Sequence, residues 1–384
     1  MLAYLDHHAT TPCDPAVVAA MAPWWSDQFA NPASRLYRPA LEAAAAVEHV
    51  TALLRQGLGA AAASQVVFTS GATEANNLAL KGLAEAALAS GNPRRRFVSV
   101  VSEHHAVLDV LHYLERHGFG LTVLPVDGQG LVDPAALAAA LEPDVLAVSV
   151  MAANNEIGTI APLTALAPLV HSAGAVLHVD AAQAVGHIPL AMGALGIDLL
   201  SLSGHKFYGP KGIGALLVAP GVPLAPQLHG GGQQGGLRAG TLPVPLIVGL
   251  AAALELAIAD HAARAMRLAV LRDQLWEGLQ AIGGFSLNGP PPGPSRLPHN
   301  LNVTALGVEG NRLHQLLRRQ IAISSGSACS QGSPSHVLAA LGRSRLEAAA
   351  TLRFGLGRGT TAAEIEQALQ AVGDAMQTLR HPTG

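Results

Sequence analysis

The fold is decided by residues 178–214, which read HVDAAQAVGHIPLAMGALGIDLLSLSGHKFYGPKGIG. The stretch opens at the end of an apolar run that stops at Asp180. It contains a second apolar run, residues 199–202, that stops before the turn SGHK at residues 203–206. Short apolar runs bounded by turn residues predict buried strands. Two such strands, each followed by polar side chains and separated by helical or loop sequence, are typical of a parallel sheet.

The same alternation continues on both sides of this stretch. Helical patterns cover residues 41–58, 75–89 and 361–379. We therefore predict an α/β fold, in which a mostly parallel sheet is flanked by helices and functional side chains gather where the strands end. The predicted strands are residues 66–69, 97–102, 121–126, 145–150, 176–180, 199–202 and 214–218.

The length of the chain, 384 residues, suits two domains or one large α/β domain. A long helical pattern at residues 244–279 can bridge to a second region, in which a further strand and helices follow a proline-rich loop. We predict a large domain of residues 13–250. A smaller α+β domain is expected from residues 1–12 and 251–384.

Composition excludes several classes of partner. The net charge is -3, and the arginine triplet at residues 94–96 is the largest basic cluster, so neither nucleic acid nor an acidic membrane surface is an expected partner. The first residues show neither a basic segment nor an apolar segment typical of a secretion signal, so secretion is not expected. The alanine-rich stretches are interrupted by polar residues and turns, so a membrane span is not expected either. Its two cysteines, Cys13 and Cys329, favour a reducing compartment, which we take to be the cytoplasm. Neither His-Glu-x-x-His nor Cys-x-x-Cys occurs, which argues against zinc.

Lys206 and Asp180 are the first candidates for chemistry. A lysine in a sharp glycine-rich loop can form a Schiff base with a carbonyl cofactor. An exposed lysine without a catalytic role in a surface turn would give the same sequence pattern. An aspartate at a strand end can cap the next helix, or it can hold a pyridine nitrogen protonated so that the ring becomes an electron sink. Gln183 would then lie on the same side as Asp180 and donate to a ring hydroxyl.

Other polar residues could complete such a site. Gly71, Ala72 and Thr73 begin a predicted helix and offer backbone N–H groups to a phosphate, to which Ser203 and His205 add donors. An ordinary capped helix is the alternative. His104 follows another predicted strand and could stack on the cofactor ring and exchange protons with substrate, or it could be a partly buried structural histidine.

Taken together, the motifs resemble the cysteine desulfurases of the NifS/IscS group, which are pyridoxal-phosphate enzymes of the class V aminotransferase superfamily with the type I transferase fold. The similarity runs from Tyr4 to about Thr361. It is carried by YLD at 4–6, ATTP at 9–12, NPAS at 31–34, FTSGATE at 68–74, EH at 103–104, NNEIG at 154–158, DAAQ at 180–183, SGHK at 203–206, RAGT at 238–241, SSGSAC at 324–329 and RF at 353–354.

This resemblance implies a role for each candidate. Lys206 would form the Schiff base and Asp180 would hold the pyridine nitrogen. The remaining roles are stacking on the ring for His104, a contact with the ring hydroxyl for Gln183, phosphate binding for Ala72, Thr73, Ser203 and His205, phosphate binding in the neighbouring subunit of a homodimer for Thr241, and binding of the substrate carboxylate for Asn155 and Arg353.

The implied reaction converts L-cysteine to L-alanine and leaves the sulfur as a persulfide on Cys329. The run SSGSACSQGSPS around Cys329 consists of small residues without hydrophobic periodicity, which predicts an exposed loop. The sulfur would pass to an acceptor protein for iron–sulfur cluster or other cofactor biosynthesis. Two alternatives stay open: a cystine or selenocysteine lyase on the same scaffold, and a sulfur-carrier subunit without turnover.

Overall fold

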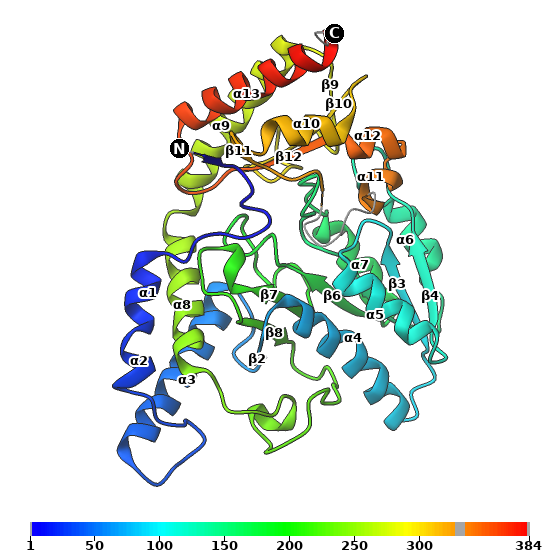
Figure 1. Ribbon diagram of the computed structural model, residues 1–384. Helices are drawn as coiled ribbons and strands as arrows, with labels where there is room; N and C mark the ends of the chain where they lie inside the picture. Colours follow the sequence, from blue (N-terminus) through cyan, green and yellow to red (C-terminus); the bar gives the residue numbers. More distant parts are fainter. Residues whose placement is uncertain (1, 327–334, 382–384) are drawn as a thin grey trace.

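The computed structural model describes residues 2–326 and 335–381, and its centre is a seven-stranded sheet (Figure 1). The strands lie in the order β2-β8-β7-β6-β5-β3-β4. Strand β8 pairs antiparallel with both of its neighbours, and the other neighbouring strands pair in parallel. The predicted mostly parallel sheet is confirmed. The bounds are Gln65–Thr69 (β2), Arg96–Val100 (β3), Gly120–Leu124 (β4), Val145–Ser149 (β5), Val176–Asp180 (β6), Leu199–Ser203 (β7) and Gly214–Val218 (β8).

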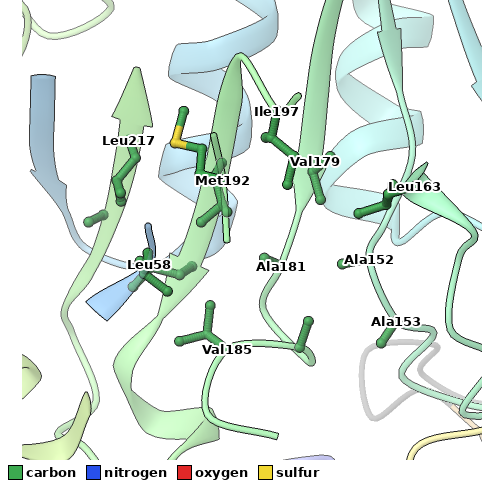
Figure 2. Close-up of a cluster of buried hydrophobic side chains, with 14 of the residues drawn as sticks. Leu58, Ala152, Ala153, Leu163, Val179, Ala181, Val185, Met192, Ile197 and Leu217 are labelled. Carbon is green, nitrogen blue, oxygen red and sulfur yellow. The ribbon is translucent and has the colours of Figure 1, made fainter. Parts of the chain in front are cut away.

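Helices cover both faces of this sheet, because successive side chains of a strand point to opposite faces. Val67 and Leu216 pack with helices α4 and α5, whereas Phe68 and Leu217 pack on the other face with α3, α7 and α8. Figure 2 shows part of this second core, where strand residues meet Leu58 and Met192. The helices are Pro15–Met21 (α1), Pro23–Ser26 (α2), Arg38–Gly57 (α3), Ala72–Ala89 (α4), His105–Glu115 (α5), Pro134–Ala140 (α6), Leu163–Ser172 (α7) and Val244–Ala259 (α8).

A second, smaller unit lies at one end of the large one (Figure 1). Its core contains Leu5 from the start of the chain together with Leu275, Phe354 and Val372 from the later part. The pairing of β1 with β11 is parallel, and β10 lies antiparallel between β12 and β9. The elements are Ala3–Tyr4 (β1), His261–Ile282 (α9), Phe285–Leu287 (β9), Asn300–Ala305 (β10), Gly310–Leu317 (α10), Ile321–Ala322 (β11), His336–Ala340 (α11), Arg345–Ala349 (α12), Thr351–Gly355 (β12) and Ala362–Arg380 (α13).

Helices α8 and α9 join the two units and meet at a bend of 71°. Ala257 near the end of α8 is still packed in the core of the large unit, whereas Leu268 of α9 belongs to the small one. The predicted boundary at residue 250 therefore falls inside α8, and we propose Asp260 as the junction. Within the described residues, no single helix has the length and apolar composition needed to cross a membrane; the bent α8–α9 pair meets those two criteria only when its helices are taken together.

Strand β8 draws two loops together at the carboxyl end of the sheet. Gly214 pairs with Thr69 of β2 on one side and with Ser203 of β7 on the other. A Cβ atom at Gly214 would lie 2.7 Å from the Cα of Gly71, so only glycine leaves room for the loop that follows β2. The turn at Gly71 is thereby held beside Ser203, at the edge where β6 and β3 also end.

Candidate active site

A cavity of about 600 Å³ opens at this carboxyl edge of the sheet. Its lining comes from five loops of the large unit, which follow β2, β3, β5, β6 and β7, from residues 8–10 and from β12. The cavity brings together ten of the residues predicted for the site: Ala72, Thr73, His104, Asn155, Asp180, Gln183, Ser203, His205, Lys206 and Arg353. Sequence reasoning missed His8, Thr10, Met151 and Lys211, which also line it.

Asp180 ends β6 and is almost completely buried. Its Oδ2 accepts a hydrogen bond of 2.7 Å from Nδ2 of Asn76, and its Oδ1 accepts one of 2.9 Å from the backbone N–H of Ala182. The two donors hold the carboxylate in one orientation. A fixed negative charge at the cavity wall suits a cationic ring nitrogen. Asn76 lies within α4, and no local sequence signal marks it as a partner of Asp180.

Lys206 ends the short 3-10 turn Gly204–Lys206 that follows β7. Nζ of Lys206 donates to the backbone oxygens of His8 at 2.7 Å and Ala9 at 2.9 Å. The carbonyl oxygen of Lys206 accepts from Nε2 of His187 at 2.9 Å. The amine therefore lies between the sheet edge and the N-terminal segment, where it is oriented toward the cavity that it lines.

The N-terminus of α4 faces the cavity beside β7. Gly71 has a φ of 157°, which L-residues rarely adopt, and it places the first N–H groups of the helix next to Ser203. Ser70 donates its N–H to Oε2 of Glu74 at 2.7 Å, and Glu74 pairs with Arg238 at 2.8 Å, which fixes the turn. The helix dipole and these donors make the region suitable for a phosphate.

His205 and His104 are both neutral near pH 7. Burial and, after it, the nearby charges of Lys206 and Lys211 lower the pKa of His205 to about 4. For His104, burial is the largest effect and lowers the pKa below its ordinary value, although Asp180 opposes it. Nδ1 of His104 accepts from the N–H of Ala106 at 3.0 Å, so the ring proton resides on Nε2.

Arg353 belongs to the small unit and lines the cavity. It lies in β12, and its exposed fraction is 1%. Nη2 of Arg353 pairs with Oδ1 of Asp6 at 2.7 Å, and Nη1 donates to the backbone oxygen of Asn155 at 3.1 Å. A fixed guanidinium at the cavity wall can bind a carboxylate through two parallel hydrogen bonds.

One predicted residue stands apart from this cavity, and for another the structure gives no position. Thr241 is exposed and does not contribute to the lining that the described residues form. Cys329 lies outside the described residues. Cys13 is partly exposed, and burial with the nearby charge of Asp14 raises the pKa of its thiol, which makes it a poor nucleophile.

Comparisons with known proteins agree with this geometry. The family model described as "Aminotransferase class-V" matches residues 3–368. A protein named cysteine desulfurase IscS from Anaeromyxobacter dehalogenans (strain 2CP-C) is 44% identical over 382 residues, which span 98% of this chain and 93% of that one. A solved NifS-like protein has a TM-score of 0.91 at 34% identity and covers 99% of this chain and 100% of its own.

A second solved structure, described as SspA in complex with cysteine, has a TM-score of 0.80 at 36% identity and covers 92% of this chain and 98% of its own. The family model and the curated relative each extend over nearly the whole chain, so the similarity includes both units. The chain therefore belongs to the class V aminotransferase family, where it groups with the cysteine desulfurases.

Proposed function

We propose that the chain is a pyridoxal 5'-phosphate-dependent cysteine desulfurase that converts L-cysteine to L-alanine. One observation carries the proposal: a single cavity is lined by a lysine amine, by a buried carboxylate with two hydrogen-bond donors and by a buried guanidinium. These three groups, Lys206, Asp180 and Arg353, match the carbonyl, the ring nitrogen and the substrate carboxylate that such a reaction has to hold.

The donor set of the cavity fits this cofactor. The N–H groups of Ala72 and Thr73 with Ser203 and neutral His205 would hold the phosphate, and Asp180 would hold the ring nitrogen. His104, whose ring lines the same cavity, would stack on the cofactor ring. When bound, the cofactor supplies an electron sink for the negative charge that forms on the amino-acid Cα.

The protein's own groups then have separate tasks. Arg353 binds the substrate carboxylate, helped by Asn155, and so fixes which bond of Cα is presented to Lys206. Nζ of Lys206 takes the proton from Cα. His104 is neutral, and its Nδ1 accepts from the N–H of Ala106, so the ring presents its Nε2–H to the cavity as a hydrogen-bond donor for the substrate. It can act as a proton carrier when Nε2 exchanges this proton for one that it takes from the substrate.

Cys329 is assigned the sulfur transfer. Its thiolate attacks the substrate sulfur, so that an S–S bond forms while the Cβ–S bond breaks and leaves its electron pair on the substrate carbon. That carbon takes up a proton and becomes the methyl group of alanine. The terminal sulfur of the persulfide would then pass to an acceptor protein.

The assembly expected to do this is a homodimer in the cytoplasm. Two observations support the dimer. Thr241 is exposed, so its hydroxyl can contact the phosphate of a second subunit. The segment before Thr241 is held against α4 by the ion pair between Arg238 and Glu74. Sedimentation of the purified protein tests the dimer. If a dimeric Thr241→Ala variant loses the cofactor, the shared phosphate site is supported. If its affinity for the cofactor is unchanged, Thr241 does not contribute to the site.

The decisive experiment is mass analysis of the protein after exposure to L-cysteine. We expect one added sulfur on the peptide that carries Cys329, and stoichiometric alanine. Cys329→Ser should fold and bind cofactor but release no sulfur. Sulfide release at the parent rate by Cys329→Ser would overturn the proposal, and retained turnover of cystine or selenocysteine by Cys329→Ala would favour a lyase instead. Absence of any cofactor absorbance from the parent would favour the non-catalytic carrier.

A further inference from the structure

A buried chain of hydrogen bonds leads from the core of the molecule to the wall of the cavity. Nη1 of Arg296 donates to Oδ1 of Asn300 at 2.8 Å, Nδ2 of Asn300 lies 3.1 Å from Nε2 of His8, and Nδ1 of His8 lies 3.0 Å from Oε1 of Gln183. Arg296, Asn300, His8 and Gln183 have exposed fractions of 1%, 0%, 1% and 6%. Water therefore has little access to the inner members.

The direction of the bonds is fixed at the inner end. A guanidinium can only donate, so the amide oxygen of Asn300 faces Arg296 and its NH₂ group faces the other way. That NH₂ group also donates to the backbone oxygen of Glu156 at 3.0 Å, and a carbonyl can only accept. The second N–H of Asn300 therefore points at Nε2 of His8, which must be an acceptor.

The outer end fixes the same direction independently. Nε2 of Gln183 donates to the backbone oxygen of His8 at 3.0 Å, so the amide oxygen of Gln183 faces the ring of His8. Nδ1 of His8 must then be a donor. Only the neutral ring with its proton on Nδ1 satisfies both neighbours.

The surroundings of His8 support this neutral state. Burial is the main cause that holds the pKa of His8 well below its ordinary value, and the positive charge of Arg353 acts in the same direction, as do His187 and Lys206. The ring of His8 is stacked on that of His299, with centroids 4.6 Å apart, and His299 is stacked on His187 at 4.1 Å. The stack keeps the ring from turning.

We propose that His8 is a positioning residue that fixes the amide of Gln183 with an N–H group toward the cavity. One N–H of that amide is used on His8, and the other has no partner among the described residues although the side chain lines the cavity. A donor at this place favours a ligand oxygen that carries negative charge. Resting on the proposed function, the inference is that His8, through Gln183, stabilises the deprotonated ring oxygen of the cofactor.

The test is an absorbance titration of the cofactor-loaded protein against pH, without substrate. A donor stabilises the more negative form of the ring oxygen, so its loss should raise the pH at which the bound cofactor gives up its proton. For His8→Phe, which retains a flat ring, we expect an upward shift of about one pH unit, the size of one hydrogen bond to a charged group. His8→Asn should titrate near the parent, because its amide nitrogen is as many bonds from Cα as Nδ1.

Two further variants separate positioning from packing. His299→Phe keeps the stack, and Nδ1 of His299 has no hydrogen-bond partner among the described residues, so its titration should match the parent. Gln183→Leu should shift as far as His8→Phe. The double variant should shift no further, because both changes remove the same donor.

The outcomes separate the two proposals. If the parent protein shows no cofactor band, the proposed function fails. If the parent shows the band but His8→Phe titrates like the parent, or adds its shift to that of Gln183→Leu, the inference about His8 fails alone. Should His8→Phe not fold, ¹⁵N resonances of the histidine rings in the parent decide the matter: a His8 ring protonated on Nε2 would overturn the inference.

Discussion

Arg353 of β12 and Asp6 of the N-terminal segment form an ion pair, with Nη2 of the guanidinium 2.7 Å from Oδ1 of the carboxylate. Arg353 has an exposed fraction of 1%, and the carboxylate of Asp6 is mostly covered as well. A buried guanidinium held in this way keeps its plane in one orientation, so a substrate carboxylate meets a fixed fork and not a flexible cation.

Arg353→Lys should therefore impair substrate binding more than the chemical step. Lysine retains the positive charge but presents a single ammonium group, which cannot bind a carboxylate through two parallel bonds. We expect KM for L-cysteine to rise about tenfold or more, with a smaller change in kcat, in steady-state alanine formation. The absorbance of the bound cofactor should not change. A fall in kcat at constant KM would assign Arg353 a different role.

Asn76→Asp should weaken cofactor binding. It would place a second carboxylate where Nδ2 of Asn76 now lies, 2.7 Å from Oδ2 of Asp180, and two carboxylates at that distance share a proton. The charge that holds the ring nitrogen would then be halved, and we expect the dissociation constant of the cofactor to rise about tenfold or more.

The next residue offers a matched control. Asn77 donates to the backbone oxygen of Thr73 in its own helix, so Asn77→Asp adds the same charge away from Asp180. Cofactor affinity is measured by titrating the dialysed apoprotein. Equal effects of the two variants would show that general charge, and not contact with Asp180, is responsible.

The free energy of unfolding should fall below pH 6.5 because of His178. This residue is fully buried between Ser149 and Ser201, and burial lowers its pKa to about 4. In the unfolded chain His178 becomes protonated near pH 6.5, whereas in the folded protein it stays neutral down to about pH 4. Its stabilising contribution to the free energy of unfolding is therefore present above pH 6.5 and is lost as the pH falls toward 4. At pH 5 the loss is about 2 kcal/mol.

Urea unfolding at pH 7.5 and pH 5 measures this effect. His178→Gln removes the titrating ring and should reduce the difference between the two pH values by about that amount, even if its stability is lower at both. An undiminished difference would mean that other groups, such as His187, cause the acid sensitivity. The pKa of His187 is also about 4, mainly because of burial.

Gln234→Ala should loosen the segment that carries Thr241. The side-chain amide of Gln234 accepts from the N–H of Phe68 at 2.6 Å and donates to its carbonyl at 3.0 Å, and so occupies the outer edge of β2 like a further strand. Loss of both bonds should cost about 1–3 kcal/mol of unfolding free energy.

Gln227→Ala is the comparison for this variant, because the one partner of the Gln227 amide among the described residues is the neighbouring Pro226 carbonyl, at 3.4 Å. It should change stability by less than about 0.5 kcal/mol. Amide hydrogen exchange of residues 65–69 provides a local measure. Unchanged protection of Phe68 in Gln234→Ala would contradict the role of this amide at the sheet edge.

The sequence was most informative where a strand ends in a polar motif. Asp180 and Lys206 could be predicted because β6 and β7 are short apolar runs whose last residues must lie at the same edge of a parallel sheet. Asn76 could not, since it lies inside a helix whose pattern does not tell which side chain faces a distant strand. His8 was missed because its partners lie 175 and 292 residues away in the chain.

The bend between α8 and α9 also could not be predicted from the sequence. Neither glycine nor proline interrupts residues 250–277, so the pattern predicts one continuous helix. The break at Asp260 coincides with two long-range contacts: Arg264 donates to the carbonyl of Gly186, and Arg358 of the small unit approaches Asp260. Arg264 also donates to the carbonyl of Ala257 across the bend, at 2.9 Å. Tertiary contacts overrode the local preference.

The ion pair between Asp6 and Arg353 joins residues 347 positions apart, and the same N-terminal segment supplies the carbonyls that hold Lys206. During synthesis the first of these residues leaves the ribosome long before the last. The cavity can therefore close only when nearly the entire chain has emerged, because its walls need both ends of the polypeptide. A chain truncated before Arg353 is thus expected to lack a complete cavity, because the wall that binds the substrate carboxylate would be missing.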